Sequence, residues 1–103
     1  MRLVVRPLAE DDIATAFDWY EAEEPSLGAQ FLDELGITFS RIRLLPQQFP
    51  QLQRGLRRAL LRRFPYAVYF IARADSIAVL AVLHQRRRPT VWKRRVRDQG
   101  GSG

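Results

Sequence analysis

Two consecutive segments in the C-terminal half, residues 66–72 and 77–83, are apolar at both odd and even positions. A β-strand turns successive side chains to opposite faces of its sheet, so these segments require cover on both faces. Residues 73–76 between them have the length of a hairpin turn, which predicts two adjacent antiparallel strands. The chain, or a partner, therefore has to supply a layer on each side of this sheet.

The N-terminal half predicts one of these layers. Apolar residues recur at helical spacing at Ile13, Ala16, Phe17 and Tyr20, and again at Leu27, Phe31, Leu35, Phe39 and Ile42. Each set forms one stripe of an amphipathic helix. Pro25 ends the first helix, Ser26 suits the N-cap of the second, and Pro46 marks its end. Because the link is so short, the two helices must pack as an antiparallel hairpin.

Two further strands are indicated, residues 2–6 before Pro7 and residues 56–62 after a loop at 46–55 that is rich in Pro and Gln. The order is β-α-α-β-β-β, an α+β fold with a small antiparallel sheet on an N-terminal helical hairpin. The hairpin covers one sheet face only. We expect the other face to be buried by the C-terminal tail or by another chain, and this favours a protein partner.

We expect residues 1–97 to form a single domain and residues 98–103 to be a flexible tail, because Gly100-Gly-Ser-Gly103 has the composition of an added linker. The 103 residues include no cysteine and one histidine, which argues against disulfides, thiolate chemistry and a zinc site. No glycine-rich phosphate loop is present. No apolar run approaches the roughly 20 residues that span a bilayer, so we expect a cytoplasmic protein with no cofactor, no metal and no membrane contact.

Charge is distributed unevenly along the chain. Residues 1–40 hold nine acidic and two basic side chains, whereas residues 41–103 hold fifteen basic and two acidic ones. Six Arg and one Lys lie between Arg86 and Arg97, directly after the last predicted strand. Such a cluster repels itself, so we expect it to meet an anion or an acidic protein.

His84 and Trp92 stand out within this cationic segment. His84 ends the last strand, where it can serve as a general base for RNA cleavage or as a structural hydrogen-bonding residue. Trp92 has two interpretations as well: it stacks on a nucleobase, or it packs the tail onto the open sheet face.

Two segments resemble a known family when they are taken with the order of elements. They are Arg62-Arg-Phe-Pro-Tyr-Ala-Val-Tyr-Phe70 and Val79-Leu-Ala-Val-Leu-His-Gln-Arg-Arg-Arg-Pro89, followed by Trp92. Together they are similar to the RelE/ParE toxin superfamily, and more closely to its ParE branch of plasmid stabilisation proteins. The resemblance extends over residues 1 to about 95.

The resemblance implies the toxin of a bacterial type II toxin–antitoxin pair, held inactive by a cognate antitoxin. ParE-type toxins are associated with inhibition of DNA gyrase, whereas RelE-type toxins cleave mRNA on the ribosome. The positions that RelE enzymes use for cleavage fall on Arg58, Leu60, Ala67, Arg86 and Trp92. Three of these five residues lack the required charge or phenol, so we expect no catalytic residue and favour ParE-like binding of a target. The alternative is a RelE-like ribosome-dependent endoribonuclease in which His84 or Tyr66 replaces the lost acid–base groups. A plain nucleic-acid-binding module is favoured by charge alone.

These interpretations give two sets of site residues. For the target, with DNA gyrase as the family implies, we expect Arg86, Arg87, Arg88, Trp92 and His84. For the antitoxin, expected to be a DNA-binding protein that forms a hetero-oligomer with this chain, we expect Phe17, Tyr20, Phe31, Leu35 and Arg58.

Overall fold

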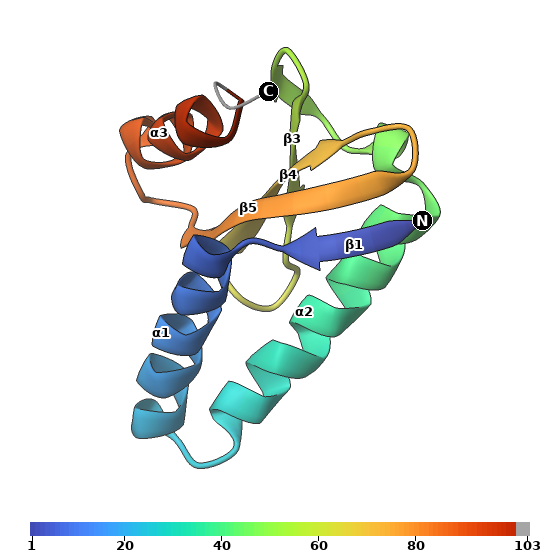
Figure 1. Cartoon of the computed structure of the whole chain (residues 1–103). Helices are drawn as coiled ribbons and strands as arrows, with labels where there is room; N and C mark the ends of the chain where they lie inside the picture. Colours follow the sequence, from blue (N-terminus) through green and yellow to red (C-terminus); the bar gives the residue numbers. More distant parts are fainter. Residues whose placement is uncertain (101–103) are drawn as a thin grey trace.

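The computed structural model describes residues 1–100, with side chains as far as Asp98, and it confirms an α+β fold (Figure 1). Its elements are β1 Arg2–Val5, α1 Pro7–Glu23, α2 Leu27–Leu44, the 3-10 helix η1 Pro46–Gln48, β2 Gln51–Gln53, β3 Leu56–Leu60, β4 Tyr66–Ala72, β5 Ser76–His84 and α3 Pro89–Gly100. The helical hairpin and the strands at 56, 66 and 76 lie where the sequence predicts them. Three elements were not expected, η1, β2 and α3.

The sheet has five strands in the order β1-β5-β4-β3-β2. Strands β2 to β5 are antiparallel, as expected, and β1 adds to β5 in parallel, which makes the sheet mixed. Sequence patterns identify β1 as a strand but do not specify its neighbour, because that pairing joins residues more than seventy positions apart. Strand β2 is three residues long and polar at Gln51 and Gln53, so its composition resembles that of a loop.

A β-bulge in β5 decides which face its last residues occupy. Tyr69 pairs with Ala81 and Phe70 with Val79, so Leu80 is the extra residue. Leu80 and Ala81 therefore both face away from the helical hairpin, and Val82 returns to the hairpin side. The shift of parity also brings His84 to the side of α1.

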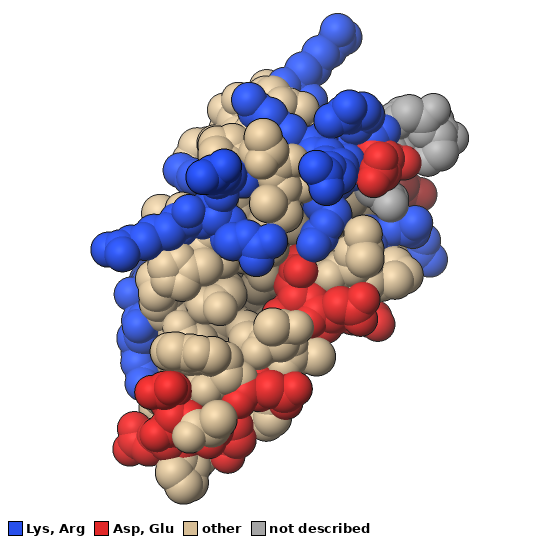
Figure 2. Space-filling view, turned by 90° about the vertical axis from the view of Figure 1, so that its left-hand side faces the viewer, with Lys and Arg blue, Asp and Glu red and all other residues tan. Residues whose placement is uncertain are grey.

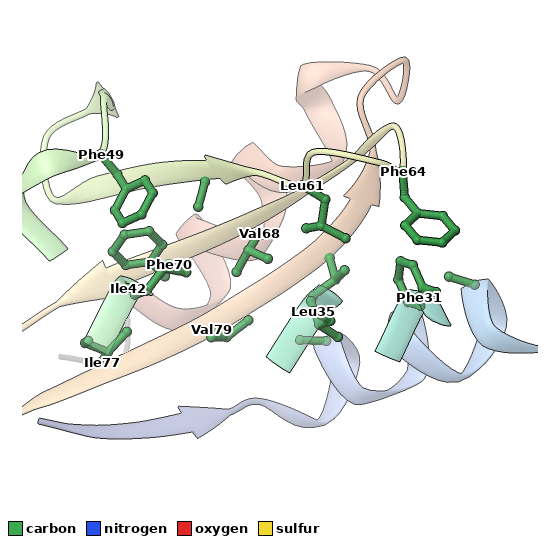
Figure 3. Packing of buried hydrophobic residues seen from close by; sticks show 14 of the residues in the cluster. Phe31, Leu35, Ile42, Phe49, Leu61, Phe64, Val68, Phe70, Ile77 and Val79 are labelled. Carbon is green, nitrogen blue, oxygen red and sulfur yellow. The ribbon is translucent and has the colours of Figure 1, made fainter. Parts of the chain in front are cut away.

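The larger core lies between the sheet and the α1–α2 hairpin (Figure 3). Phe31 and Ile42 of α2 are fully buried against Val68 and Phe70 of β4 and Val79 of β5. Each of these side chains contributes roughly 1.5–3 kcal/mol on burial. The helical stripes predicted from sequence thus point into the chain's own sheet.

Helix α3 covers the opposite face of the sheet (Figure 1). Trp92 packs there with Tyr69, Leu80 and Leu83 in a second core. Pro89 begins the helix, where its missing N–H costs nothing. The expectation that the C-terminal tail covers this face is confirmed, so an uncovered sheet face gives no argument for a partner. Residues 98–100 of the expected tail belong to α3, and residues 101–103 lie outside the described residues.

The turn of the helical hairpin is held by a side chain that the sequence did not indicate. Ser26 occupies the N-cap position with φ of 70°, but its hydroxyl makes no cap hydrogen bond, so that expectation was wrong. Instead the Glu21 carboxylate accepts hydrogen bonds from the backbone N–H of Ser26 at 2.9 Å and of Gly28 at 2.8 Å. Glu21 of α1 therefore caps α2 and fixes the angle between the helices.

Candidate functional site

The cationic residues Arg86, Arg87 and Arg88 lie in the turn between β5 and α3, and all three are exposed. Backbone hydrogen bonds fix this turn: Arg86 N–H donates to His84 Nδ1 at 3.0 Å and Arg87 N–H to the His84 carbonyl at 2.9 Å. Gln85 N–H also donates to the Pro65 carbonyl at 2.8 Å. Among the described residues, none hydrogen-bonds to the three guanidinium groups, which extend from a turn whose backbone is hydrogen-bonded. We call residues 86–88 the cationic turn.

Positive and negative side chains gather in different parts of the face that Figure 2 shows. Figure 2 shows Lys and Arg mainly over the upper part of this face, and Asp and Glu around the far end of the hairpin and again at mid-height, where they border the cations. The charge asymmetry of the sequence is therefore a charge asymmetry in space. An acidic or phosphate-bearing partner is drawn to the end of the molecule that holds the cationic turn.

Arg95 differs from the other cations of α3 because it is paired and largely buried. Its guanidinium donates to both carboxylate oxygens of Asp12, at 2.9 and 3.0 Å, and to the Leu80 carbonyl at 3.0 Å. Asp12 also accepts the Val82 N–H at 3.0 Å. The pairing of β1 with β5 ends at Val79, which leaves the next backbone groups on this edge of β5 without a strand partner. The Asp12 and Arg95 side chains satisfy two of these groups, the Val82 N–H and the Leu80 carbonyl. The hydrogen bond to Asp12 raises the pKa of Arg95.

Trp92 lies inside the second core and not beside the exposed guanidinium groups. Its ring stacks on Tyr69 with centroids 5.7 Å apart and an interplanar angle of 19°, and it is 9% exposed. Of its two expected roles, the structure favours packing of the C-terminal segment onto the sheet. Little of the Trp92 ring is therefore accessible from outside the molecule in this structure.

The residues expected to bind the antitoxin are mostly inaccessible. Phe31 is 0% exposed, Leu35 is 3% and Tyr20 is 8%, whereas Phe17 and Arg58 are partly buried. The apolar stripe of each helix is the face that the helix turns to the chain's own core. The stripe residues therefore have little surface left for contact with an antitoxin. The large apolar residues that the hairpin region does expose lie off these stripes: Leu8, Trp19, Leu32, Ile37, Leu44 and Leu45.

The five positions matched to RelE cleavage lie on or beside the face that α3 covers. Alternation along β3 places Arg58 and Leu60 on the face of Leu56, together with Ala67 and Trp92. Arg58 Nε is buried without a hydrogen-bond partner among the described residues. No imidazole, carboxylate or phenol occupies any of these five positions, so the groups for proton transfer are missing there.

A groove opens on the other side of the sheet, where β4 begins and β5 ends beside α1. This strand-end groove has a volume of about 420 Å³ and is lined by Trp19, Tyr20, Pro65, Tyr66 and His84. A smaller hollow of about 150 Å³ adjoins it through Tyr66 and His84, and its wall includes Asp12, Thr15 and Arg87. We call it the Arg87 hollow.

Tyr66 and His84 form the boundary between the groove and the hollow. Their rings meet edge to face with centroids 5.4 Å apart. Burial raises the pKa of the Tyr66 phenol, although Arg87 acts in the opposite direction, so the phenol remains protonated near neutral pH. Sequence reasoning missed Trp19, although an aromatic residue off the apolar stripe of a helix is a usable signal for an exposed ring.

Two features are absent from the described residues. No helix there is long and apolar enough to cross a membrane. Within residues 1–98, whose side chains are described, no three His, Cys, Asp or Glu side chains are grouped so as to hold a metal ion.

Comparison with known proteins identifies relatives of this chain. The family described as the ParE toxin of type II toxin–antitoxin system, parDE, matches residues 3–89. A solved structure titled "Chromosomal ParDE TA system from P. aeruginosa" has the same fold, with a TM-score of 0.65 and 21% sequence identity. That similarity covers 82% of this chain and 95% of the other. No curated protein matches the sequence.

Proposed function

The chain belongs to the ParE toxin family of type II toxin–antitoxin systems, and on that premise we propose that it inhibits growth by binding a target protein, DNA gyrase as the family implies. The observation that carries this proposal is the cationic turn. Its three guanidinium groups are exposed, while hydrogen bonds to His84 and Pro65 hold its backbone in place. Because the backbone is already ordered, binding of an acidic surface has to order only the Arg side chains, whose hydrogen bonds to carboxylates are charge-assisted.

The proposal assigns binding, and not covalent chemistry, to these residues. Leu60, Ala67 and Trp92 supply neither charge nor a phenol at the positions matched to RelE cleavage. His84 then has a supporting role, since its Nδ1 accepts the Arg86 N–H and so orients the turn. We expect His84→Ala to reduce toxicity only as far as it loosens that turn.

One observation favours the alternative of a RelE-like endoribonuclease. Tyr66 and His84 stand edge to face, next to Arg87, so two groups capable of proton transfer and one cation share the Arg87 hollow. If the chain cleaves mRNA on the ribosome, and if the cleavage requires both His84 and Tyr66, the endoribonuclease is the correct function and gyrase binding is not. Primer extension on cellular mRNA after induction of the wild type and of Tyr66→Phe separates the two activities.

For neutralisation we propose a cognate, DNA-binding antitoxin that forms a hetero-oligomer with this chain. Among the described residues no strand pairs with the outer edge of β3 beyond Arg57, and Leu60 on that edge is 46% exposed. Beside this edge, an apolar groove of about 180 Å³ runs along α2, with Ile37 62% exposed. An extended antitoxin segment that continued the sheet, followed by an apolar helix on α2, would use both features.

The two surfaces are separate, and this allows a test in cells. We expect Arg86→Glu with Arg87→Glu to abolish growth inhibition, while the variant still copurifies with the antitoxin. The matched control, Arg94→Glu with Arg97→Glu, makes the same change of charge at exposed positions of α3 and should remain toxic. Full toxicity of the first variant would exclude the cationic turn as the contact with the target.

A further inference from the structure

The strand-end groove contains an exposed aromatic residue that the fold itself does not need. Trp19 is 58% exposed, and its ring meets Tyr20 edge to face with centroids 5.1 Å apart. Four of the five residues that line the groove carry aromatic rings. Flat π surfaces of this kind accept a nucleobase of any sequence, because every base has a face that can stack.

The adjoining Arg87 hollow is lined by hydrogen-bond donors. His84 Nδ1 accepts the Arg86 N–H at 3.0 Å, so the neutral imidazole carries its proton on Nε2, where it can donate. The Thr15 hydroxyl, the protonated Tyr66 phenol and the Arg87 guanidinium complete the set. These groups are the usual ligands of a phosphate.

The one carboxylate in the described wall of the hollow is already paired within the fold. Asp12 is engaged by Arg95 in a two-pronged ion pair and by the Val82 N–H. Its charge is therefore offset within the fold, and Arg87 has no carboxylate within ion-pair distance among the described residues. The hollow is a cationic pocket at the end of an aromatic groove.

We propose that the strand-end groove and the Arg87 hollow together bind one nucleotide of a single-stranded nucleic acid. The base lies against Trp19 and Tyr66, and its phosphate is bound by Arg87 and His84. Both spaces share Tyr66 and His84 as walls, so base and phosphate sites are contiguous, as in a nucleotide. This site lies on the opposite face of the sheet from Arg58 and Ala67, and it shares Arg87 with the cationic turn.

Nuclear magnetic resonance can test this proposal, because the chain has two tryptophans in different environments. The full-length protein, labelled with nitrogen-15, is titrated with a thymidine oligonucleotide of about ten nucleotides, a length typical of single-strand sites. The Trp19 indole N–H signal should shift, while that of Trp92, buried against Tyr69, should not. An unchanged Trp19 signal at saturating oligonucleotide would overturn the proposal.

Fluorescence anisotropy with the same oligonucleotide then measures how much the base site and the phosphate site each contribute to the affinity. We expect Trp19→Ala and Arg87→Ala each to weaken binding about tenfold, as loss of a stacked base or of a phosphate contact does. Arg97→Ala removes one exposed charge elsewhere and should weaken binding no more than about twofold. Equal losses for Arg87→Ala and Arg97→Ala would reduce the interaction to general charge attraction and contradict the proposal.

Three competitors identify the ligand chemistry. An abasic strand of the same length should compete poorly with the labelled oligonucleotide. Comparison of RNA and DNA competitors of the same length shows which of the two nucleic acids the site prefers. Poly-glutamate supplies the negative charge of an acidic protein without a base. If poly-glutamate shifts the Trp19 signal and competes as well as the oligonucleotide, the groove is a protein contact and the proposal is wrong.

Discussion

Replacing Asp12 should detach α3 from the sheet edge. In Asp12→Ala the Arg95 guanidinium keeps a side-chain exposure of 16% but loses both carboxylate contacts, and the Val82 N–H loses its acceptor. Breaking one side of a buried ion pair costs about 3–5 kcal/mol, and partial exposure places this pair near the lower end. An unsatisfied N–H adds about 1 kcal/mol. We therefore expect a loss of about 4 kcal/mol in the free energy of unfolding.

A double-mutant cycle separates the pair from the other contacts. Arg95→Ala should cost about 2 kcal/mol, because Asp12 still accepts the Val82 N–H while the Leu80 carbonyl loses a donor. The double variant should be less unstable than the two single losses added together, by about 1–3 kcal/mol. Urea unfolding followed by far-ultraviolet circular dichroism gives these energies. Near-ultraviolet signals of Trp92 report whether α3 remains packed.

Two results would refute this reasoning. A coupling energy below about 0.5 kcal/mol would show that the pair contributes no more than an exposed salt bridge. Arg94→Ala, which removes an exposed cation one residue away, should change stability by no more than about 0.5 kcal/mol. A loss as large as that of Arg95→Ala would mean that helix propensity, and not the pair, is being measured.

Three other expectations concern the hairpin and the aromatic core. Gly28→Ala places a Cβ about 2.8 Å from the Phe17 ring and should lower the free energy of unfolding by about 1–3 kcal/mol. Gly36→Ala meets nothing within 4 Å and should raise the free energy of unfolding by up to about 1 kcal/mol. Urea unfolding measures both changes. Burial raises the pKa of Tyr66 above its usual 10.0, so the folded state holds the proton more tightly and stability should fall as pH rises above that value; Tyr66→Phe should lessen the fall. Ile37→Asp should weaken antitoxin binding at least tenfold by surface plasmon resonance while growth inhibition persists, and unchanged binding would move the antitoxin off α2.

Local patterns predicted those parts of the fold that depend on neighbours in sequence. The stripes of α1 and α2 and the apolar runs of β4 and β5 are periodic, so both the elements and the need for two covering layers followed from them. The bulge at Leu80 and the parallel pairing of β1 depend on contacts between distant residues. Helix α3 was missed because its charged residues conceal the single apolar stripe that contains Trp92 and Val96.

The candidate site was predicted in part for the same reason. Arg86, Arg87 and Arg88 are exposed in a turn, as charge and position indicated. The roles of Trp92 and Phe31 depend on what packs against them, which sequence patterns do not show. An apolar stripe in the sequence can be either a buried core face or an exposed binding face. Only the three-dimensional structure shows which of the two it is.

Inhibition of purified DNA gyrase tests the central claim most directly. We expect the wild-type chain to inhibit supercoiling. Arg86→Glu with Arg87→Glu should raise the concentration for half inhibition by at least about a hundredfold, as loss of several charge-assisted contacts does. Arg94→Glu with Arg97→Glu should remain close to the wild type. Equal inhibition by wild type and by the first variant would contradict the claim that the cationic turn binds the target.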